Sequence, residues 1–376
     1  MAWVPCRAME HDFHGPSYTI GIEEELMIVD AASYSLANAI ESLLGDVADG
    51  EVKPELHESV LEISTDPAAN TAEAGRRLRG LREQVRERAA RRGLAIGSAG
   101  THPFAMWEDQ RIVARPRYRE LVTALRFVAR QELIFGMHVH VGLDDPEKAI
   151  HVANGMRVHL GVLLALSANS PFWRADSTGL QSTRIPIFRA FPRVGIPPHY
   201  RDWADYQREI EFMVQSGVIE DYTWLWYDVR PHPKFGTVEV RVCDSQTRIE
   251  HTLALTALIQ AMVRELAEHY EAGGELASYP WQMLDENKWL AARHGLGAEL
   301  VDLPSSDRVG AKALAQRLLD RLRDHAQDLG SAGDLDGIAD LLERGNGADR
   351  QLVVYEANHD LRELMAEIVA ASGPGD

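Results

Sequence analysis

The stretch YTIGIEEELMIVD, which runs from Tyr18 to Asp30, alternates apolar and polar side chains. Successive side chains of a β-strand point to opposite faces, so residues two apart share a face. One face would carry Ile20, Ile22, Leu26 and Ile28, and the other Gly21, Glu23 and Glu25. We therefore predict a strand with one buried apolar face and one acidic face.

Two later stretches repeat this pattern, LIFGMHVHVGL over 133–143 and TVEVRVCD over 237–244. Their polar positions are His138 and His140 in the first stretch, and Glu239 and Arg241 in the second. Parallel strands covered on both faces read as continuous apolar runs, which these are not. The alternation favours an α+β fold, in which an antiparallel sheet packs helices on one face and leaves a wet groove on the other.

Helical spacing of apolar residues occurs between these strands and throughout the last part of the 376-residue chain. We predict helices over 70–92, about 146–168 and 246–271, and helices alone from Asp307 onward. Asn70 or Thr71 can cap the first helix, and Gly93 ends it. Because no linker separates these blocks, we expect an N-terminal extension over 1–17 and a single domain over 18–376 with a helical C-terminal part.

Composition narrows the class of protein. The chain has 39 Lys and Arg against 57 Asp and Glu, a formal charge of −18, which argues against binding nucleic acid by neutralising its backbone. Two cysteines, Cys6 and Cys243, are too few for a disulfide scaffold. The N-terminus lacks an apolar leader, and the longest apolar stretch, 158–168, is too short to cross a bilayer. We expect a soluble cytoplasmic protein without a membrane partner.

The polar faces of the strands would form one surface if the strands are neighbours. That surface would carry Glu23, Glu25, Glu62, His138, His140, Glu239 and Arg241. Carboxylates gathered in one place repel one another, and a divalent cation relieves this repulsion. Oxygen ligands suit Mg²⁺ or Mn²⁺. Glu55 and Glu62 are separated by an odd number of positions, so a bend between them is needed if both serve one site.

Other readings of these residues stay open. Any half-exposed sheet alternates polar residues, although lysine is absent from all three stretches. The histidines of His138-x-His140 could bind zinc, but no third ligand lies nearby in the sequence. The sequence has no Walker A loop, no G-x-G-x-x-G and no G-x-S-x-G. We interpret the basic run 76–92 as a solvated helix face, and Trp224 and Trp226 as core or groove wall, with base stacking less favoured.

The motifs together resemble the glutamate–cysteine ligase type 2 family, also described as YbdK-like carboxylate–amine ligases. The resemblance extends from about Tyr18 to the C-terminus. It rests on G-x-E-x-E at 21–25, KPEL at 53–56 with Ser59 and Glu62, GMHVHVG at 136–142, SANSPFW at 167–173, Ser182-x-Arg184, E-x-R-x-x-D at 239–244 and ENKW-x-AAR-x-G at 286–295.

The resemblance implies a fold like that of glutamine synthetase and guanido kinase catalytic domains, a curved antiparallel sheet with helices on its convex face and ATP and Mg²⁺ on its concave face. It also implies a reaction. The γ-carboxylate of glutamate attacks ATP to give an acyl phosphate and ADP, and an amine, cysteine by default, then displaces phosphate to leave γ-glutamylcysteine. The ligands expected are these small molecules, and the resemblance suggests a homo-oligomer, in the simplest case a dimer.

The resemblance also implies roles for individual residues. Glu23, Glu25, Glu62 and Glu239 would hold Mg²⁺, or Mn²⁺ in its place, with Glu55 as a further metal or catalytic candidate. Arg241 and His138 would stabilise the transferred phosphoryl group, and His140 would help to orient it. Arg184, Asn169 and Ser170 are candidates for binding ATP or the carboxylate substrate. Ligation of another amine, a metal-dependent phosphohydrolase or phosphotransferase, and a non-catalytic nucleotide-binding protein remain alternatives.

Overall fold

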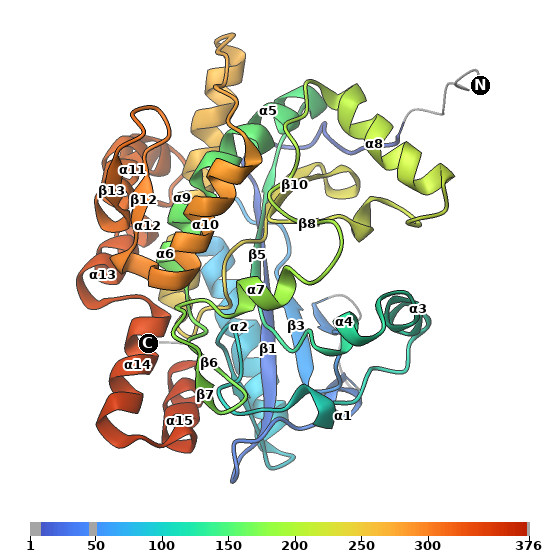
Figure 1. The fold of residues 1–376 in the computed structure, drawn as a ribbon, viewed down its shortest axis with the longest axis vertical. Helices are drawn as coiled ribbons and strands as arrows, with labels where there is room; N and C mark the ends of the chain where they lie inside the picture. The colour runs from blue at the N-terminus through green and yellow to red at the C-terminus, as the bar shows by residue number, and fades with distance from the viewer. Residues whose placement is uncertain (1–8, 45–50, 374–376) are drawn as a thin grey trace.

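A seven-stranded antiparallel sheet forms the centre of the protein (Figure 1). The computed structural model describes residues 9–44 and 51–373. The strand order is β10-β11-β5-β1-β3-β2, and β4 also pairs with β1. The strands are β1 (Ile20–Asp30), β2 (Val52–Pro54), β3 (Val60–Ser64), β4 (Leu94–Gly97), β5 (Met137–Gly142), β10 (Val229–His232) and β11 (Thr237–Val240). The predicted α+β fold with an antiparallel sheet is confirmed.

Helices make up most of the remaining structure. They are α1 (Ile40–Leu44), α2 (Thr71–Ala90), α3 (Pro116–Leu125), α4 (Phe127–Arg130), α5 (Pro146–Met156), α6 (Leu160–Ser167), α7 (Arg184–Phe188), α8 (Trp203–Gln215), α9 (Ile249–Glu271), α10 (Trp281–His294), α11 (Ala311–Asp328), α12 (Ala332–Leu335), α13 (Gly337–Arg344), α14 (Gly347–Asn358) and α15 (Leu361–Ala371). Three two-stranded pairs complete the fold: β6 (Phe172–Trp173) with β7 (Asp176–Ser177), β8 (Val194–Gly195) with β9 (Trp226–Tyr227), and β12 (Glu299–Val301) with β13 (Arg308–Gly310).

The predicted helices are present with small changes in their ends. Asn70 caps α2 by accepting a hydrogen bond from Glu73 N at 3.0 Å, and Gly93 beyond the helix has a φ of +69°. The prediction of helices alone from Asp307 onward is wrong at Arg308–Gly310, which form strand β13 and pair with β12. From Ala311 to Ala371 the described chain is helical apart from short turns. These C-terminal helices, orange to red in Figure 1, lie on one side of the sheet. Part of the expected N-terminal extension also packs on the domain, because Phe13 is buried and contacts Trp203; Cys6 lies outside the described residues.

One apolar helical segment of the structure is longer than the apolar stretch over 158–168 identified in the sequence. Helices α5 and α6 and the 3₁₀ turn between them run from Pro146 to Ser167, which among the described residues is long and apolar enough to cross a membrane. The estimate from residues 158–168 was therefore too short. Because 83% of its apolar window is buried inside the protein, this segment packs as a core helix against α9 and α10.

Strand β1 divides its three consecutive glutamates between two environments. Glu23 and Glu25 face the polar side, whereas Glu24 is fully buried on the helix side. Both carboxylate oxygens of Glu24 accept hydrogen bonds from Arg82 of α2, each at 2.8 Å. Arg82 also bonds the backbone carbonyls of Gln246 and Thr247. The interpretation of 76–92 as a wholly solvated face is therefore wrong at Arg82, which is 1% exposed.

We expect Arg82→Met to lower the free energy of unfolding by about 3–5 kcal/mol, because it leaves the buried carboxylate of Glu24 without its counter-charge. Urea unfolding monitored by circular dichroism would measure the change. The control is Arg86→Met on the same helix, whose partner Glu83 is exposed. That substitution should cost no more than about 1 kcal/mol. Equal effects of the two substitutions would contradict a structural role for the buried pair.

Candidate active site

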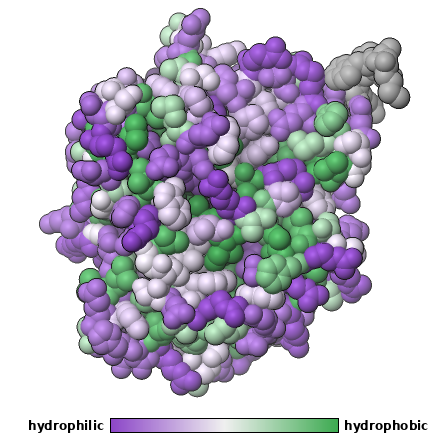
Figure 2. Space-filling model, viewed as in Figure 1, coloured by the Kyte–Doolittle hydropathy of each residue, from purple (hydrophilic) through white to green (hydrophobic). Residues whose placement is uncertain are grey.

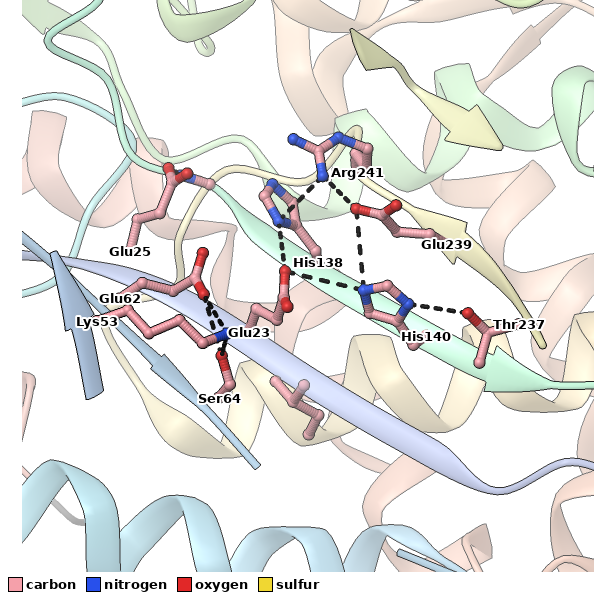
Figure 3. Close-up of polar contacts among 12 residues, drawn as sticks. Glu23, Glu25, Lys53, Glu62, Ser64, His138, His140, Thr237, Glu239 and Arg241 are labelled. Carbon is pink, nitrogen blue, oxygen red and sulfur yellow. Dashed lines mark hydrogen bonds and ion pairs between the residues drawn. The ribbon is translucent and has the colours of Figure 1, made fainter. Parts of the chain in front are cut away.

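The neighbouring strands β3, β1, β5 and β11 bring the predicted polar residues onto one surface. Glu25 lies opposite Glu62, Glu23 opposite His138, and Glu239 opposite His140 in the ladder. These side chains face a cavity of about 480 Å³. The cavity is lined by all the residues that the sequence predicts for this surface, together with Glu55: Glu23, Glu25, Glu55, Glu62, His138, His140, Glu239 and Arg241. Figure 3 shows all of these except Glu55.

The groove is more enclosed than the sequence indicates. A small apolar cluster that includes Leu56, Ile134, Phe188 and Phe191 links α7 to the segment around α3 and α4, and these elements form a wall of the cavity. Figure 2 shows hydrophobic side chains near the middle of this face, around α7 and toward α3, on an otherwise largely hydrophilic surface. A cavity with apolar walls and a charged floor restricts water and strengthens electrostatic interactions inside it.

Glu55 and Glu62 reach the cavity from a hairpin. Strands β2 and β3 pair antiparallel, and Glu55 begins the turn between them. This turn supplies the bend that the odd spacing requires. Burial, then repulsion from Glu62, raises the pKa of Glu55 well above its ordinary value. Burial, then repulsion from Glu23, raises the pKa of Glu62, although Lys53 Nζ lies 3.2 Å from its carboxylate.

Glu23, His140 and Glu239 form a group whose ligand atoms all lie within 4.8 Å of one another. His140 Nε2 is 3.8 Å from Glu23 Oε2 and 3.9 Å from Glu239 Oε1. His140 Nδ1 contacts Thr237 Oγ1 at 2.9 Å, which fixes the ring so that Nε2 faces the two carboxylates. Nε2 is buried without a hydrogen-bond partner among the described residues. Two carboxylates and a free imidazole nitrogen are a donor set that fits a divalent cation.

Two arginines compensate Glu239, which is 1% exposed. Arg230 Nε donates to Glu239 Oε2 at 2.6 Å, and Arg241 Nη1 donates to Oε1. Burial alone would raise the pKa of Glu239, but Arg230 and Arg241 hold it well below its ordinary value. Arg241 also lies 3.4 Å from His138 Nδ1, which contacts Glu23 at 3.2 Å. The carboxylates, histidines and arginines therefore form one connected network.

The inner end of the cavity holds carboxylates with less compensation. Glu25 accepts a hydrogen bond from Gly136 N, and burial raises its pKa despite the nearby Arg184. Glu132 lies beside it, and burial followed by repulsion from Glu25 raises the pKa of Glu132 to about 8. Glu55 and Arg184 complete this end. A cation bound here would offset both the burial and the mutual repulsion that raise these pKa values.

The raised pKa of Glu132 gives a pH-dependent stability. Folded protein holds a proton that the unfolded chain releases above about pH 4.5, so this contribution is complete below pH 4.5 and is lost as the pH rises toward 8. We expect Glu132→Gln to melt at a higher temperature than the parent above pH 8, and at a similar temperature near pH 4. Calorimetry without divalent cations would measure this. A difference that does not vary with pH would contradict it.

The structure places two of the predicted binding residues, Asn169 and Ser170, away from the cavity. Asn169 and Ser170 are fully buried and do not line the cavity, so the expectation that they contact substrate is corrected. Both hydrogen-bond the carboxylate of Asp244 behind the cavity wall. Arg184 does line the inner end, but its Nη1 and Nη2 donate to the carbonyls of Val242 and Arg241. Only its Nε is without a partner among the described residues.

Several cavity residues escaped the sequence analysis. Arg230 and His232 lie on the face of β10 that lines the cavity, next to Glu239 of β11. Their spacing of two is hard to recognise in the sequence, because the strand has only four residues and contains Pro231. Glu132 precedes β5 and carries no periodic signal. An aromatic end of the cavity, made by Tyr222, Trp224, Trp226, His232 and Phe235, includes the two tryptophans interpreted as core or groove wall.

Solved structures share this fold. The glutamate–cysteine ligase of Francisella tularensis in complex with AMP aligns with a TM-score of 0.72 and 14% identity, over 96% of this chain and 89% of that one. A bifunctional glutathione synthetase from Pasteurella multocida aligns with a TM-score of 0.59 and 14% identity, over 95% of this chain and 53% of that one. At this identity the likeness establishes the fold.

Sequence comparison identifies the family. A protein of Rubrobacter xylanophilus, provisionally named glutamate–cysteine ligase 2-1, is 42% identical over 97% of this chain and 98% of its own length. One from Solibacter usitatus, provisionally named glutamate–cysteine ligase 2, is 40% identical over 93% and 92%. The model of glutamate–cysteine ligase family 2 matches residues 19–367. The family model and these relatives, together with the shared fold, identify an ATP-dependent carboxylate–amine ligase. The chain belongs to glutamate–cysteine ligase family 2.

Proposed function

We propose that this ligase joins glutamate to cysteine and releases ADP and phosphate. A γ-carboxylate oxygen attacks the γ-phosphorus of ATP, the bond to ADP breaks, and an acyl phosphate forms. The amine nitrogen then attacks the acyl carbon, phosphate leaves with the bonding electrons, and the nitrogen loses its proton. The observation that carries the proposal is the convergence of six carboxylates with Arg184 and Arg241 in a cavity of a family 2 chain.

We further propose Mg²⁺, with Mn²⁺ as a substitute, as the metal. Glu23, His140 and Glu239 fit one ion, and Glu25, Glu55 and Glu62 are the candidates for further ions. Bound Mg²⁺ would neutralise the phosphate oxygens while the phosphoryl group moves between two oxygens. The carboxylates support this assignment, since oxygen ligands suit Mg²⁺ and Mn²⁺. The free Nε2 of His140 beside them favours a bound ligand at this point, since an imidazole nitrogen buried without a partner is costly.

The protein residues would mainly position the reacting groups. The fork of Arg241 would donate to the transferred phosphoryl group or the acyl phosphate, and His138 beside it would add a donor to the same charge. Arg184, which lines the inner end, would supply positive charge for binding the carboxylate substrate. The walls around α3 and α7 would limit access of water, which otherwise hydrolyses the acyl phosphate.

The aromatic end of the cavity is the place we propose for the nucleotide base. His232 and Phe235 stack with ring centroids 4.2 Å apart, and Trp224 lies on the same cavity. Stacking on aromatic side chains suits any base because each has a π-face. The base would then lie at one end and the carboxylates that face the phosphates would lie beside it.

A coupled assay of ADP release tests the function. Glutamate is held constant, amines are varied with cysteine among them, and Mg²⁺ is present or removed by chelation. We expect ADP release that requires both an amine and Mg²⁺, and mass spectrometry should detect the amide product. ADP release that is independent of any amine would favour a phosphohydrolase. Binding of ATP without turnover across the panel would favour a non-catalytic nucleotide-binding protein, and turnover with a different amine would change the second substrate alone.

We also propose that the protein works in the cytoplasm on small-molecule substrates as a homo-oligomer. Trp281 and Trp289, 51% and 45% exposed on α10, offer an apolar surface that a second copy could cover. Light scattering coupled to size exclusion would measure the mass, which we expect to be at least twice the 41.9 kDa of one chain. A monomer at micromolar concentration would contradict this part of the proposal.

A further inference from the structure

The segment that carries Arg241 is held in a bulge. In the ladder between β11 and β5, Val240 pairs with Val139, but the next bridge joins Asp244 to Gly136. Three residues of one chain segment therefore oppose two of the other, which is the definition of a β-bulge. A bulge redirects side chains and removes backbone groups from the ladder, so the carbonyls of Arg241 and Val242 need other donors.

Arg184 supplies those donors. Its Nη2 lies 3.1 Å from the carbonyl of Arg241, and its Nη1 lies 3.2 Å from that of Val242. Arg184 is 4% exposed, and its guanidinium lies 3.9 Å from the buried carboxylate of Asp244. Asp244 in turn accepts hydrogen bonds from Ser170 Oγ at 2.7 Å and Ser182 Oγ at 2.8 Å. A buried network of polar side chains, Arg184, Asp244, Ser170 and Ser182, thus holds the bulge through hydrogen bonds to its carbonyls.

The network continues into the C-terminal helical part. Asn169 donates its backbone N–H to Asp244 at 2.8 Å. Gln351 of α14 donates its Nε2 to the carbonyl oxygen and to Oδ1 of Asn169, at 3.0 and 2.8 Å. Gln351 is 4% exposed and does not line the catalytic cavity. Helix α14 is therefore connected to the cavity through two buried polar residues, Asn169 and Asp244, and Arg184.

Glycines pack closely against three members of this network. A Cβ added to Gly136 would come within 2.4 Å of Arg184 Nη2, and one added to Gly100 within 2.7 Å of Asp244 Cγ. A Cβ on Gly347, the first residue of α14, would lie 2.1 Å from Asn169 Oδ1. Backbone packs this closely against three polar side chains only because these positions lack a Cβ. The side chains therefore have little room to move.

We propose that Asp244, Asn169 and Gln351 are positioning residues, which hold Arg184 and, through the bulge, aim Arg241 into the cavity. This inference rests on the proposed function in giving Arg241 its role on the phosphoryl group. It also explains the motifs over 167–170 and 182–184, because Ser170 and Ser182 contact each other and Asp244 behind the cavity wall. Helix α14 then belongs to the support of the site.

Kinetics of Asp244→Asn and Gln351→Ala test the proposal. We expect kcat for ADP release to fall by about 10- to 100-fold, the range for residues that orient groups at a site, with the KM for ATP changed less than threefold. The matched control is Gln260→Ala on α9, which removes another fully buried amide, bonded to the carbonyl of Tyr18 and to Ser331. Its melting temperature should fall similarly, while kcat stays near that of the parent.

A double substitution separates positioning from general destabilisation. If Asp244 acts through Arg241, Asp244→Asn should have little further effect on kcat in an Arg241→Lys background. Equal losses of kcat in Gln351→Ala and Gln260→Ala, or full additivity in the double variant, would overturn the proposal. If the parent itself releases no ADP, the proposed function fails, and crystal structures of the two variants still decide the inference: a displaced Arg241 supports it and an unmoved one overturns it.

Discussion

Replacement of Glu239 by glutamine is expected to reduce Mg²⁺-dependent ADP release by more than about 100-fold, because even residues that support metal ligands are worth about 10- to 100-fold. Glu239 is the most enclosed member of the group formed with Glu23 and His140. Glutamine keeps the shape of the side chain but removes the charge that faces the proposed ion. Steady-state kinetics over a range of Mg²⁺ concentrations would measure the loss.

The fold should be checked in the same experiment. Glu239 compensates Arg230 and Arg241, so its neutralisation leaves two buried guanidinium groups with less counter-charge. The variant is thus expected to melt at a lower temperature than the parent, whereas neutralising an exposed carboxylate would change the melting temperature little. A control is Arg230→Met, which disturbs the same ion pair without removing a proposed ligand. Activity of Glu239→Gln within a few-fold of the parent would refute the metal assignment.

Arg241→Lys is expected to lower kcat by about 10³-fold, at the lower end of what a transition-state arginine contributes in phosphoryl transfer. Lysine keeps the positive charge but lacks the planar fork that can donate two parallel hydrogen bonds. Because the ammonium group can still compensate Glu239, the melting temperature should change little. Single-turnover measurement of ADP formation, with ATP binding followed separately, would locate the defect in the chemical step.

The result can be set against a second arginine. Arg82→Met should lower stability far more than Arg241→Lys does, because it leaves the buried Glu24 without its counter-charge. Arg82 and Glu24, however, lie on the helix side of the sheet, away from the cavity. At a temperature where both variants are folded, the kcat of Arg82→Met should stay close to that of the parent. A loss of kcat in Arg82→Met comparable to that in Arg241→Lys would show that turnover follows general stability, and the assigned role of Arg241 would fail.

Alternation along the strands made much of the site predictable. Glu23, His138, His140 and Glu239 follow from the period of two once the strands are neighbours, and the hairpin joining β2 to β3 satisfies the odd spacing of Glu55 and Glu62. What a single strand cannot reveal is its partner. The acidic faces are predictable from the sequence, whereas the order of the strands had to be assumed and is shown only by the structure.

Three kinds of residue could not be placed from sequence. Glu132 lies outside any periodic element, so its position depends on tertiary structure alone. Arg82 occurs in a basic helix whose other charges are solvated, and only the fold shows that it meets Glu24. Asn169 belongs to a motif of the family, but a motif does not distinguish a residue that contacts substrate from one that supports the wall.

The split of three adjacent glutamates in β1 has a consequence for how this sheet can vary. A slip of one position between β1 and its neighbours would turn Glu24 toward the cavity and send Glu23 and Glu25 into the oily interior. Such a slip would therefore break the ion pair between Glu24 and Arg82 of α2 and would also remove Glu23 and Glu25 from the cavity. Both the stability of the fold and the activity of the enzyme therefore depend on the same register of β1.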